Sequence, residues 1–153
     1  MYLQDACRIQ EVLALMLITR KVDFSASHVC RLPALSDEAN RSLFGASANP
    51  RGHGHNYVLE VTVEGTPDSV TGMVMDMKFL KQILNREVVE VYDHRFLNHE
   101  VAPFDHVIPT PENIAIDIWN RLHPHLGGTR ARLHAVRIYE TPELYVDYFG
   151  EAA

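Results

Sequence analysis

The separation of strand-like and helix-like segments along the chain is the feature that most constrains its fold. Residues 54–64 have the clearest strand pattern, with β-branched side chains at Val58, Val61 and Val63. After a turn rich in Gly and Pro, residues 72–76 are expected to pair with this strand as a hairpin. Further strands are predicted over 18–28, 132–140 and 144–149.

Helix signals fall in three places. A short helix is predicted over 36–44, with Ser36 as its N-cap, and a longer one over about 77–92. A third begins at Thr110, whose hydroxyl suits an N-cap and which is followed by Pro111 at the first helical position.

The resulting order of long elements, β-β-α-α-β-β, predicts an α+β domain with a four-stranded antiparallel sheet and two helices. Two helices leave one face of such a sheet poorly covered, which favours oligomerisation. We assign residues 17–153 to this single domain and 1–16 to an N-terminal extension. A weak helical pattern runs over 8–19, and Met1 and Met16 both remain open as the start.

Composition excludes several classes of protein. The net charge is −6, with 14 Lys and Arg against 20 Asp and Glu and no basic stripe, so we expect no nucleic-acid partner. The longest apolar run, 12–18, is far shorter than the roughly 20 residues that span a membrane, so no membrane association is expected. Two cysteines are too few for a disulfide framework, which favours a reducing, cytoplasmic location.

Nine histidines are the compositional oddity, and two of them lie in Gly-His-Gly-His-Asn-Tyr. Residues two apart on a strand point to the same side, so His53 and His55 can face one metal ion. If the first two strands pair as a hairpin, His28 can lie beside them. Three histidines with an open fourth position are typical of catalytic zinc. Taken alone, His53 and His55 could equally be a pair of surface histidines. His28 taken alone could be a buried core residue.

Three acidic positions are further candidates. Asp93 and His94 follow the predicted helix 77–92 and could form an acid–base pair, although a histidine is also favourable at a helix C-terminus. Glu140 ends a predicted strand, where its carboxylate could accept two hydrogen bonds from a planar amidine-like edge such as that of a pterin. Glu112 is explained fully as a first-turn acid of its helix.

In combination, these segments resemble the 6-pyruvoyl tetrahydropterin synthase family, which includes bacterial 6-carboxy-tetrahydropterin synthases. The matching motifs occur in the family's order and cover nearly all of about 18–150. They are FSASH (24–28), LSDEANRSLFG (35–45), NPRGHGHNY (49–57), EVTVEG (60–65), TGMVMDM (71–77), DHRFLN (93–98), PTPENIAIDIW (109–119) and YET (139–141).

The resemblance implies a tunnelling fold (T-fold), in which subunits assemble into a barrel, usually a dimer of trimers with active sites between subunits. It implies a lyase that acts on a small pterin, 7,8-dihydroneopterin triphosphate, and leaves open whether the pathway is that of tetrahydrobiopterin, queuosine-type deazapurines or folate. The implied roles are zinc binding by His28, His53 and His55, proton transfer by Asp93 and His94, pterin anchoring by Glu140, and a pocket wall containing Thr110 and Glu112.

One position departs from the family pattern. The family's catalytic cysteine lies six residues before the first histidine of the HGH motif, where this chain has Ser47, and Ala48 follows in place of asparagine. Because a thiol ionises far more readily than a hydroxyl, Ser47 is a poor substitute as a base. The catalytic candidates are therefore Asp93, His94 and Ser47, with the last in question.

Three readings of Ser47 remain open. The chain is a slow or altered synthase, or a relative that cleaves the dihydroneopterin side chain by a retro-aldol reaction, or a pterin-binding protein without turnover. Cys30 could supply a thiol, although a small buried residue is the simpler interpretation. The triphosphate would need basic residues, for which the candidates are Arg31, Arg41, Arg51, Lys78 and Lys81.

Overall fold

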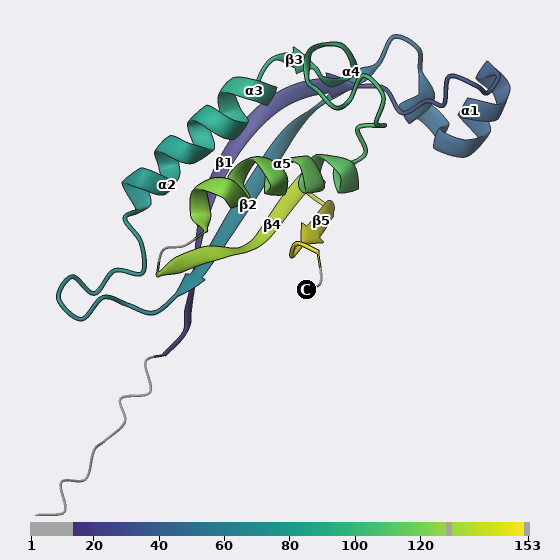
Figure 1. Cartoon of the computed structure of the whole chain (residues 1–153). Coiled ribbons are helices and arrows are strands. Elements are labelled where there is room, and N and C mark those ends of the chain that lie inside the picture. The colour runs from purple at the N-terminus through teal and green to yellow at the C-terminus, as the bar shows by residue number, and fades with distance from the viewer. Residues whose placement is uncertain (1–13, 128–129, 152–153) are drawn as a thin grey trace, which may run out of the picture.

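The computed structural model describes residues 14–127 and 130–151, which form one curved sheet with helices packed against it (Figure 1). The elements in chain order are β1 (Met16–His28), α1 (Asp37–Phe44), the 3-10 helix η1 (Gly45–Ala48), β2 (His53–Gly65), α2 (Met77–Leu84), the π-helix η2 (Asn85–Val89), α3 (Glu90–Tyr92), β3 (Arg95–Phe96), α4 (Leu97–Glu100), α5 (Pro111–Leu126), β4 (Ala131–Thr141) and β5 (Leu144–Tyr148).

The sheet has the strand order β3-β1-β2-β4-β5. Its four longer strands are antiparallel neighbours, as predicted, and β1 pairs with β2 along the whole length of both strands. A fifth strand is a correction to the four-stranded prediction: β3 pairs in parallel with β1 through Ala26 and Ser27. A strand of two residues is too short to produce a hydrophobic period, which is why the sequence does not reveal it.

The predicted hairpin partner of residues 54–64 is wrong. Residues 72–76 form no strand, and a turn lies here in which the Asp68 carboxylate accepts hydrogen bonds from the backbone N–H groups of Val70 and Thr71. Gly72 completes the turn at a φ of 70°. Because β1 and β4 occupy both edges of β2, no edge is left with which this segment could pair.

The helix predicted from the weak pattern over 8–19 can be compared with the structure only in part. Residues 8–13 lie outside the described part of the chain, whereas Met16 to Thr19 belong to β1 and pair with residues 62–65 of β2. The helical prediction is therefore wrong for these four residues, since pairing along a sheet edge outweighs a weak local preference.

The helices form close to where their capping residues predict. The Ser36 hydroxyl accepts a hydrogen bond from the N–H of Ala39, and the Thr110 hydroxyl accepts one from the N–H of Asn113. The segment predicted as one helix over 77–92 is continuous but contains the π-helical turn η2. No helix in the described ranges is long and apolar enough to cross a membrane.

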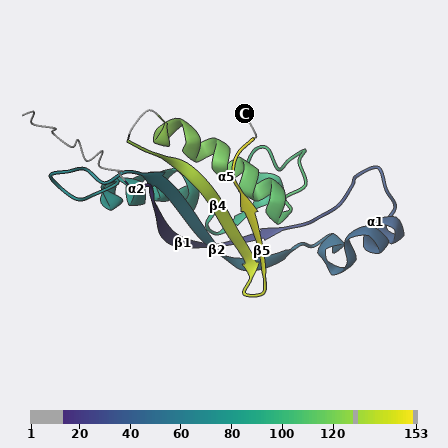
Figure 2. The same cartoon turned by 90° about the horizontal axis from the view of Figure 1, so that it is seen from below.

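The core lies on one face of the sheet only. Along β2, Tyr57, Leu59 and Val61 are fully buried, whereas Val58 between them is 37% exposed. Helices α2 and α5 pack on the buried face, and in Figure 2 α5 lies over one side of the sheet. The opposite face carries ion pairs such as Lys21–Glu60. This asymmetry is the one expected for a subunit of an oligomer, but oligomerisation stays a prediction.

Candidate metal centre

Three histidines converge where β1 and β2 meet. His28 ends β1 and lies opposite His53, the first residue of β2, so the strand pairing that the metal hypothesis required is present. The His28 Nε2 and His53 Nε2 atoms are 3.1 Å apart, and the His53 and His55 ring centroids are 4.8 Å apart. One ring nitrogen from each histidine lies within 4.8 Å of the other two.

Gly52 allows the chain to reach this arrangement. Its φ is +73°, and a Cβ there would lie 3.0 Å from the His28 carbonyl oxygen and 3.2 Å from the Phe96 ring. Only glycine fits both the backbone conformation and the space. The turn therefore returns the chain directly to His53 beside the end of β1.

The orientation of His28 is fixed by its backbone surroundings. Its Nδ1 donates to the carbonyl oxygen of Pro109 at 2.6 Å, which leaves the Nε2 lone pair directed at the other histidines. Burial, together with the smaller effects of His53 and His55, outweighs the raising effect of that hydrogen bond and lowers the pKa of His28 to about 4. Burial also lowers the pKa of His53. Both imidazoles are therefore neutral at pH 7, the form that binds metals.

The donor set fits a metal ion. Two nitrogens bound tetrahedrally to zinc lie about 3.3 Å apart, close to the His28–His53 separation. His55 Nε2 is buried and has no hydrogen-bond partner among the described residues, as expected for an atom whose partner is an ion. Three imidazoles, with no fourth ligand residue in this cluster of described residues, suit zinc and a catalytic rather than a structural site.

The buried neutral state of His28 predicts a pH dependence for metal-free protein. Its folded-state pKa of about 4 lies below the unfolded value of about 6.5, so the unfolded chain binds more protons between these values. The free energy of unfolding should fall by roughly 3 kcal/mol from this group as the pH drops from 7 to 4. Urea unfolding in the presence of a chelator, compared with His28→Gln, measures it. Parallel pH profiles for the two proteins would contradict the prediction.

Glu140 lies beside the histidines at the end of β4. Its Oε1 is 3.8 Å from His55 Nε2, and its Oε2 is buried with no hydrogen-bond partner in the described chain. Burial raises the pKa of Glu140, while His55 opposes the rise and Glu112 adds to it. Thr110 follows Pro109, the residue that holds His28, and starts α5 together with Glu112. These residues therefore border one site.

Cys30 and Tyr57 complete this cluster. Burial, and to a smaller extent the charges of Glu140 and Glu112, raise the pKa of Cys30 to about 11, so the thiol lies within the field of these carboxylates. The Tyr57 hydroxyl is 3.4 Å from His28 Nε2. Tyr57 was not among the candidates from the sequence, although its position two residues after His55 on the same strand face could have indicated it.

Asp93 and His94 form a pair of their own. The Asp93 carboxylate accepts a hydrogen bond from the Ser25 N–H at 2.8 Å and contacts His94 Nδ1, also at 2.8 Å. The hydrogen bond from Ser25 contributes most to lowering the pKa of Asp93. The His94 side chain is 83% exposed and borders a cleft of about 480 Å³ together with Ser25 and Asn56. Asp93 and His94 both contact the backbone of Ser25, whose carbonyl oxygen accepts a hydrogen bond from the His94 N–H at 2.6 Å. No hydrogen bond or ion pair among the described residues links the Asp93–His94 pair to the three histidines, although His55 lines the same cleft as His94.

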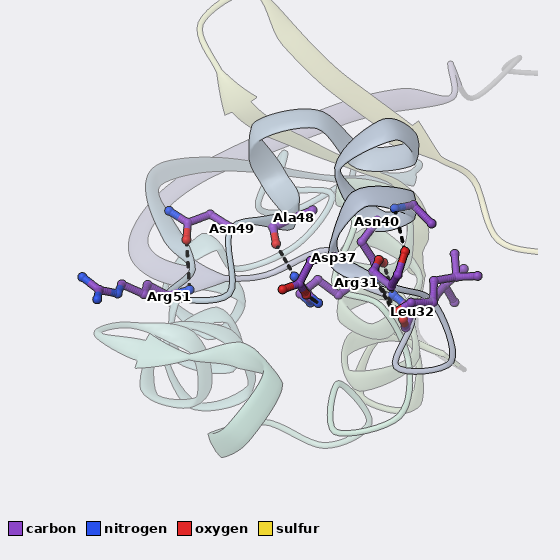
Figure 3. A network of polar contacts seen from close by, with 10 residues as sticks. Arg31, Leu32, Asp37, Asn40, Ala48, Asn49 and Arg51 are labelled. Atoms are coloured by element: carbon purple, nitrogen blue, oxygen red, sulfur yellow. Dashed lines mark hydrogen bonds and ion pairs between the residues drawn. The ribbon is translucent and has the colours of Figure 1, made fainter.

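Ser47 lies in the segment 29–52, which extends from the sheet between β1 and β2 (Figure 1). Its carbonyl oxygen accepts a hydrogen bond from the Cys30 N–H at 2.9 Å, so Ser47 is held next to the strand that ends at His28. Arg31 donates to the Ala48 carbonyl oxygen at 3.0 Å and pairs with Asp37 (Figure 3).

Asn40 holds the other part of this segment. It is fully buried, and its Oδ1 accepts from the Leu32 N–H while its Nδ2 donates to the carbonyl oxygens of Leu32, Leu35 and Ser36 (Figure 3). The segment therefore has a fixed conformation of its own. Because Arg31 is engaged within it, Arg31 is the weakest of the five candidates for holding a triphosphate.

Comparison with known proteins gives consistent matches. The family model for 6-pyruvoyl tetrahydropterin synthase matches residues 17–151. The human protein named 6-pyruvoyl tetrahydrobiopterin synthase is 42% identical over 134 residues, which cover 88% of this chain and 91% of that protein. The 6-carboxy-5,6,7,8-tetrahydropterin synthase of Rickettsia felis is 26% identical over 145 residues, covering 84% and 96%. The solved 6-pyruvoyl tetrahydropterin synthase of Caenorhabditis elegans superposes with a TM-score of 0.84 at 35% identity, covering 91% and 98%.

Proposed function

The chain belongs to the 6-pyruvoyl tetrahydropterin synthase family and has its T-fold, and from this we propose that it is a zinc-dependent lyase acting on 7,8-dihydroneopterin triphosphate. The observation that carries the proposal is the convergence of His28, His53 and His55 next to Glu140. The relatives support lyase activity on a pterin, and the three histidines support zinc.

Glu140 anchors the pterin ring in this proposal. A carboxylate accepts two parallel hydrogen bonds from the amidine-like edge of a pterin, and the Oε2 atom of Glu140 has no other partner in the described structure. Thr110 and Glu112, which start α5 next to Pro109, form the adjacent wall of the pocket. An anchored ring would direct the substrate side chain toward the three histidines.

The chemistry divides between a metal ion and this chain's own side chains. When bound, zinc supplies a Lewis acid that acidifies the side-chain hydroxyls and the neighbouring C–H bonds. The protein's part is to hold the neutral imidazoles through the Pro109 carbonyl, to bind the ring at Glu140, and to move protons at His94, which Asp93 orients.

The position of the Asp93–His94 pair supports an oligomer. Among the described residues, no hydrogen bond or ion pair joins the pair to the histidines of the same chain, so we propose that a complete site takes the pair from a neighbouring subunit. We therefore propose a homo-oligomer, a dimer of trimers that forms a barrel with active sites between subunits. The uncovered face of the sheet is consistent with this assembly (Figure 2).

Two alternatives follow from Ser47. The first is a pterin-binding protein that keeps the pocket without turnover, and the second is a dihydroneopterin side-chain-cleaving enzyme. We favour the synthase because the histidines, the Asp93–His94 pair and Glu140 are all present at the positions that the resemblance indicates.

A product assay tests the proposal. Zinc-loaded protein is incubated with 7,8-dihydroneopterin triphosphate and, separately, with dihydroneopterin, and the products are identified by mass. We expect triphosphate release from the first substrate at a slow but measurable rate, and the mass of the pterin product names the reaction. If the protein cleaves dihydroneopterin but does not act on the triphosphate, the aldolase-type function is supported and the synthase function is wrong. Binding without turnover of either substrate would leave the pterin-binding alternative.

A further inference from the structure

Tyr57 places a phenolic hydroxyl at the centre of the histidine cluster. The side chain is completely buried, and its ring stacks on Phe24 with a centroid separation of 5.1 Å. The hydroxyl is 3.4 Å from His28 Nε2, and the ring meets that of His55 edge-on at 5.5 Å. A buried hydrogen-bonding group therefore lies beside His28 in the three-histidine cluster.

The hydroxyl has one hydrogen-bond partner in the described part of the chain, the Nε2 atom of His28. The Pro109 carbonyl oxygen accepts from Nδ1 and thereby leaves Nε2 as the nitrogen that can bind a metal. A metal ion would take the lone pair that the hydroxyl now shares. A buried hydroxyl without an acceptor is costly, so in the loaded site it needs another acceptor, which a bound substrate would supply.

We propose that Tyr57 is a substrate-binding residue whose hydroxyl donates a hydrogen bond to a side-chain hydroxyl oxygen of the pterin. The inference rests on the proposed function and adds to it a basis for selecting pterins by their side chains. Glu140 would recognise the ring, whereas Tyr57 recognises the hydroxylated side chain directed at the histidines. A pterin without side-chain hydroxyls would gain nothing from Tyr57.

The test separates this role from a merely structural one. Tyr57→Phe keeps the ring that stacks on Phe24 and removes only the hydroxyl. Two ligands are titrated by calorimetry into zinc-loaded protein: 7,8-dihydroneopterin and 6-methyl-7,8-dihydropterin, which lacks the side-chain hydroxyls. We expect Tyr57→Phe to weaken binding of the first about fivefold to tenfold, the value of one hydrogen bond, and to leave binding of the second and the zinc content unchanged.

A matched control is Tyr148→Phe, which removes a tyrosine hydroxyl from β5, where the ring packs against Trp119. This variant should bind both ligands as the unmodified protein does. Equal affinity of Tyr57→Phe and the unmodified protein for dihydroneopterin would overturn the inference. So would loss of zinc in Tyr57→Phe, since the hydroxyl would then act by orienting His28.

The unmodified protein provides a second measurement that does not depend on the variant. It should bind dihydroneopterin more tightly than the 6-methyl ligand, and equal affinities would contradict a role for any donor to the side chain. If the unmodified protein binds neither ligand, the proposed function itself fails. Binding of both ligands with no effect of Tyr57→Phe leaves that function standing and removes only this inference.

Discussion

Replacing His53 with alanine is expected to abolish stoichiometric zinc binding and to lower product formation by more than about a hundredfold. Loss of groups that merely orient metal ligands costs about 10- to 100-fold in affinity or activity, and loss of a direct ligand should cost more. Two imidazoles would remain, and the His28 Nε2 atom would lose the nitrogen that lies 3.1 Å away. Metal content measured by mass spectrometry after gel filtration checks the expectation.

His106→Ala is the matched control for this experiment. His106 is an exposed histidine that pairs with Asp105 at 2.8 Å and is not part of the three-histidine cluster. The control should keep one zinc per chain and full turnover. If the unmodified protein contains no metal and takes up none from solution, the metal hypothesis is wrong, whatever the behaviour of His53→Ala.

Most of the fold was predictable because its long strands and helices carry strong local signals. A concentration of β-branched residues identifies β2, and the caps Ser36 and Thr110 identify the starts of α1 and α5. The errors occur where the position of a segment depends on the rest of the sheet. Residues 72–76 have strand character but find both edges of β2 occupied, and β3 exists only because a short segment passes the free edge of β1.

In the candidate site, too, the features with a local sequence signal were predictable and those that depend on the rest of the fold were not. The spacing of His53 and His55 is visible in the sequence, and their proximity to His28 followed once a hairpin was assumed. The carbonyl of Pro109 was not predictable, since any residue could supply that oxygen and it lies 81 positions from His28. The backbone at His94, with its φ of 58°, was not predictable either, since the residue type does not specify that conformation.

Ser47→Cys is expected to raise the turnover of dihydroneopterin triphosphate by at least about tenfold and to leave pterin affinity unchanged. A thiol with a pKa of about 8.5 ionises near neutral pH, whereas a serine hydroxyl needs strong activation. The Ser47 backbone is held by the Cys30 N–H and by the Arg31 contact to the next residue, so the new thiol should occupy the position of the present hydroxyl. Initial rates and calorimetric affinities measured on the same zinc-loaded samples separate the two effects.

The control, Ser42→Cys, introduces a thiol on the exposed side of α1 in the same segment and should change neither rate nor affinity. If the unmodified protein shows no turnover and Ser47→Cys does, the unmodified protein is a pterin-binding protein, because its site would then lack only the catalytic base. An unchanged rate in a protein that already releases triphosphate would mean that another group abstracts the proton, with His94 as the leading candidate. The position of Ser47 would in that case have no part in catalysis, and the departure from the family pattern would be a change of mechanism rather than a loss of function.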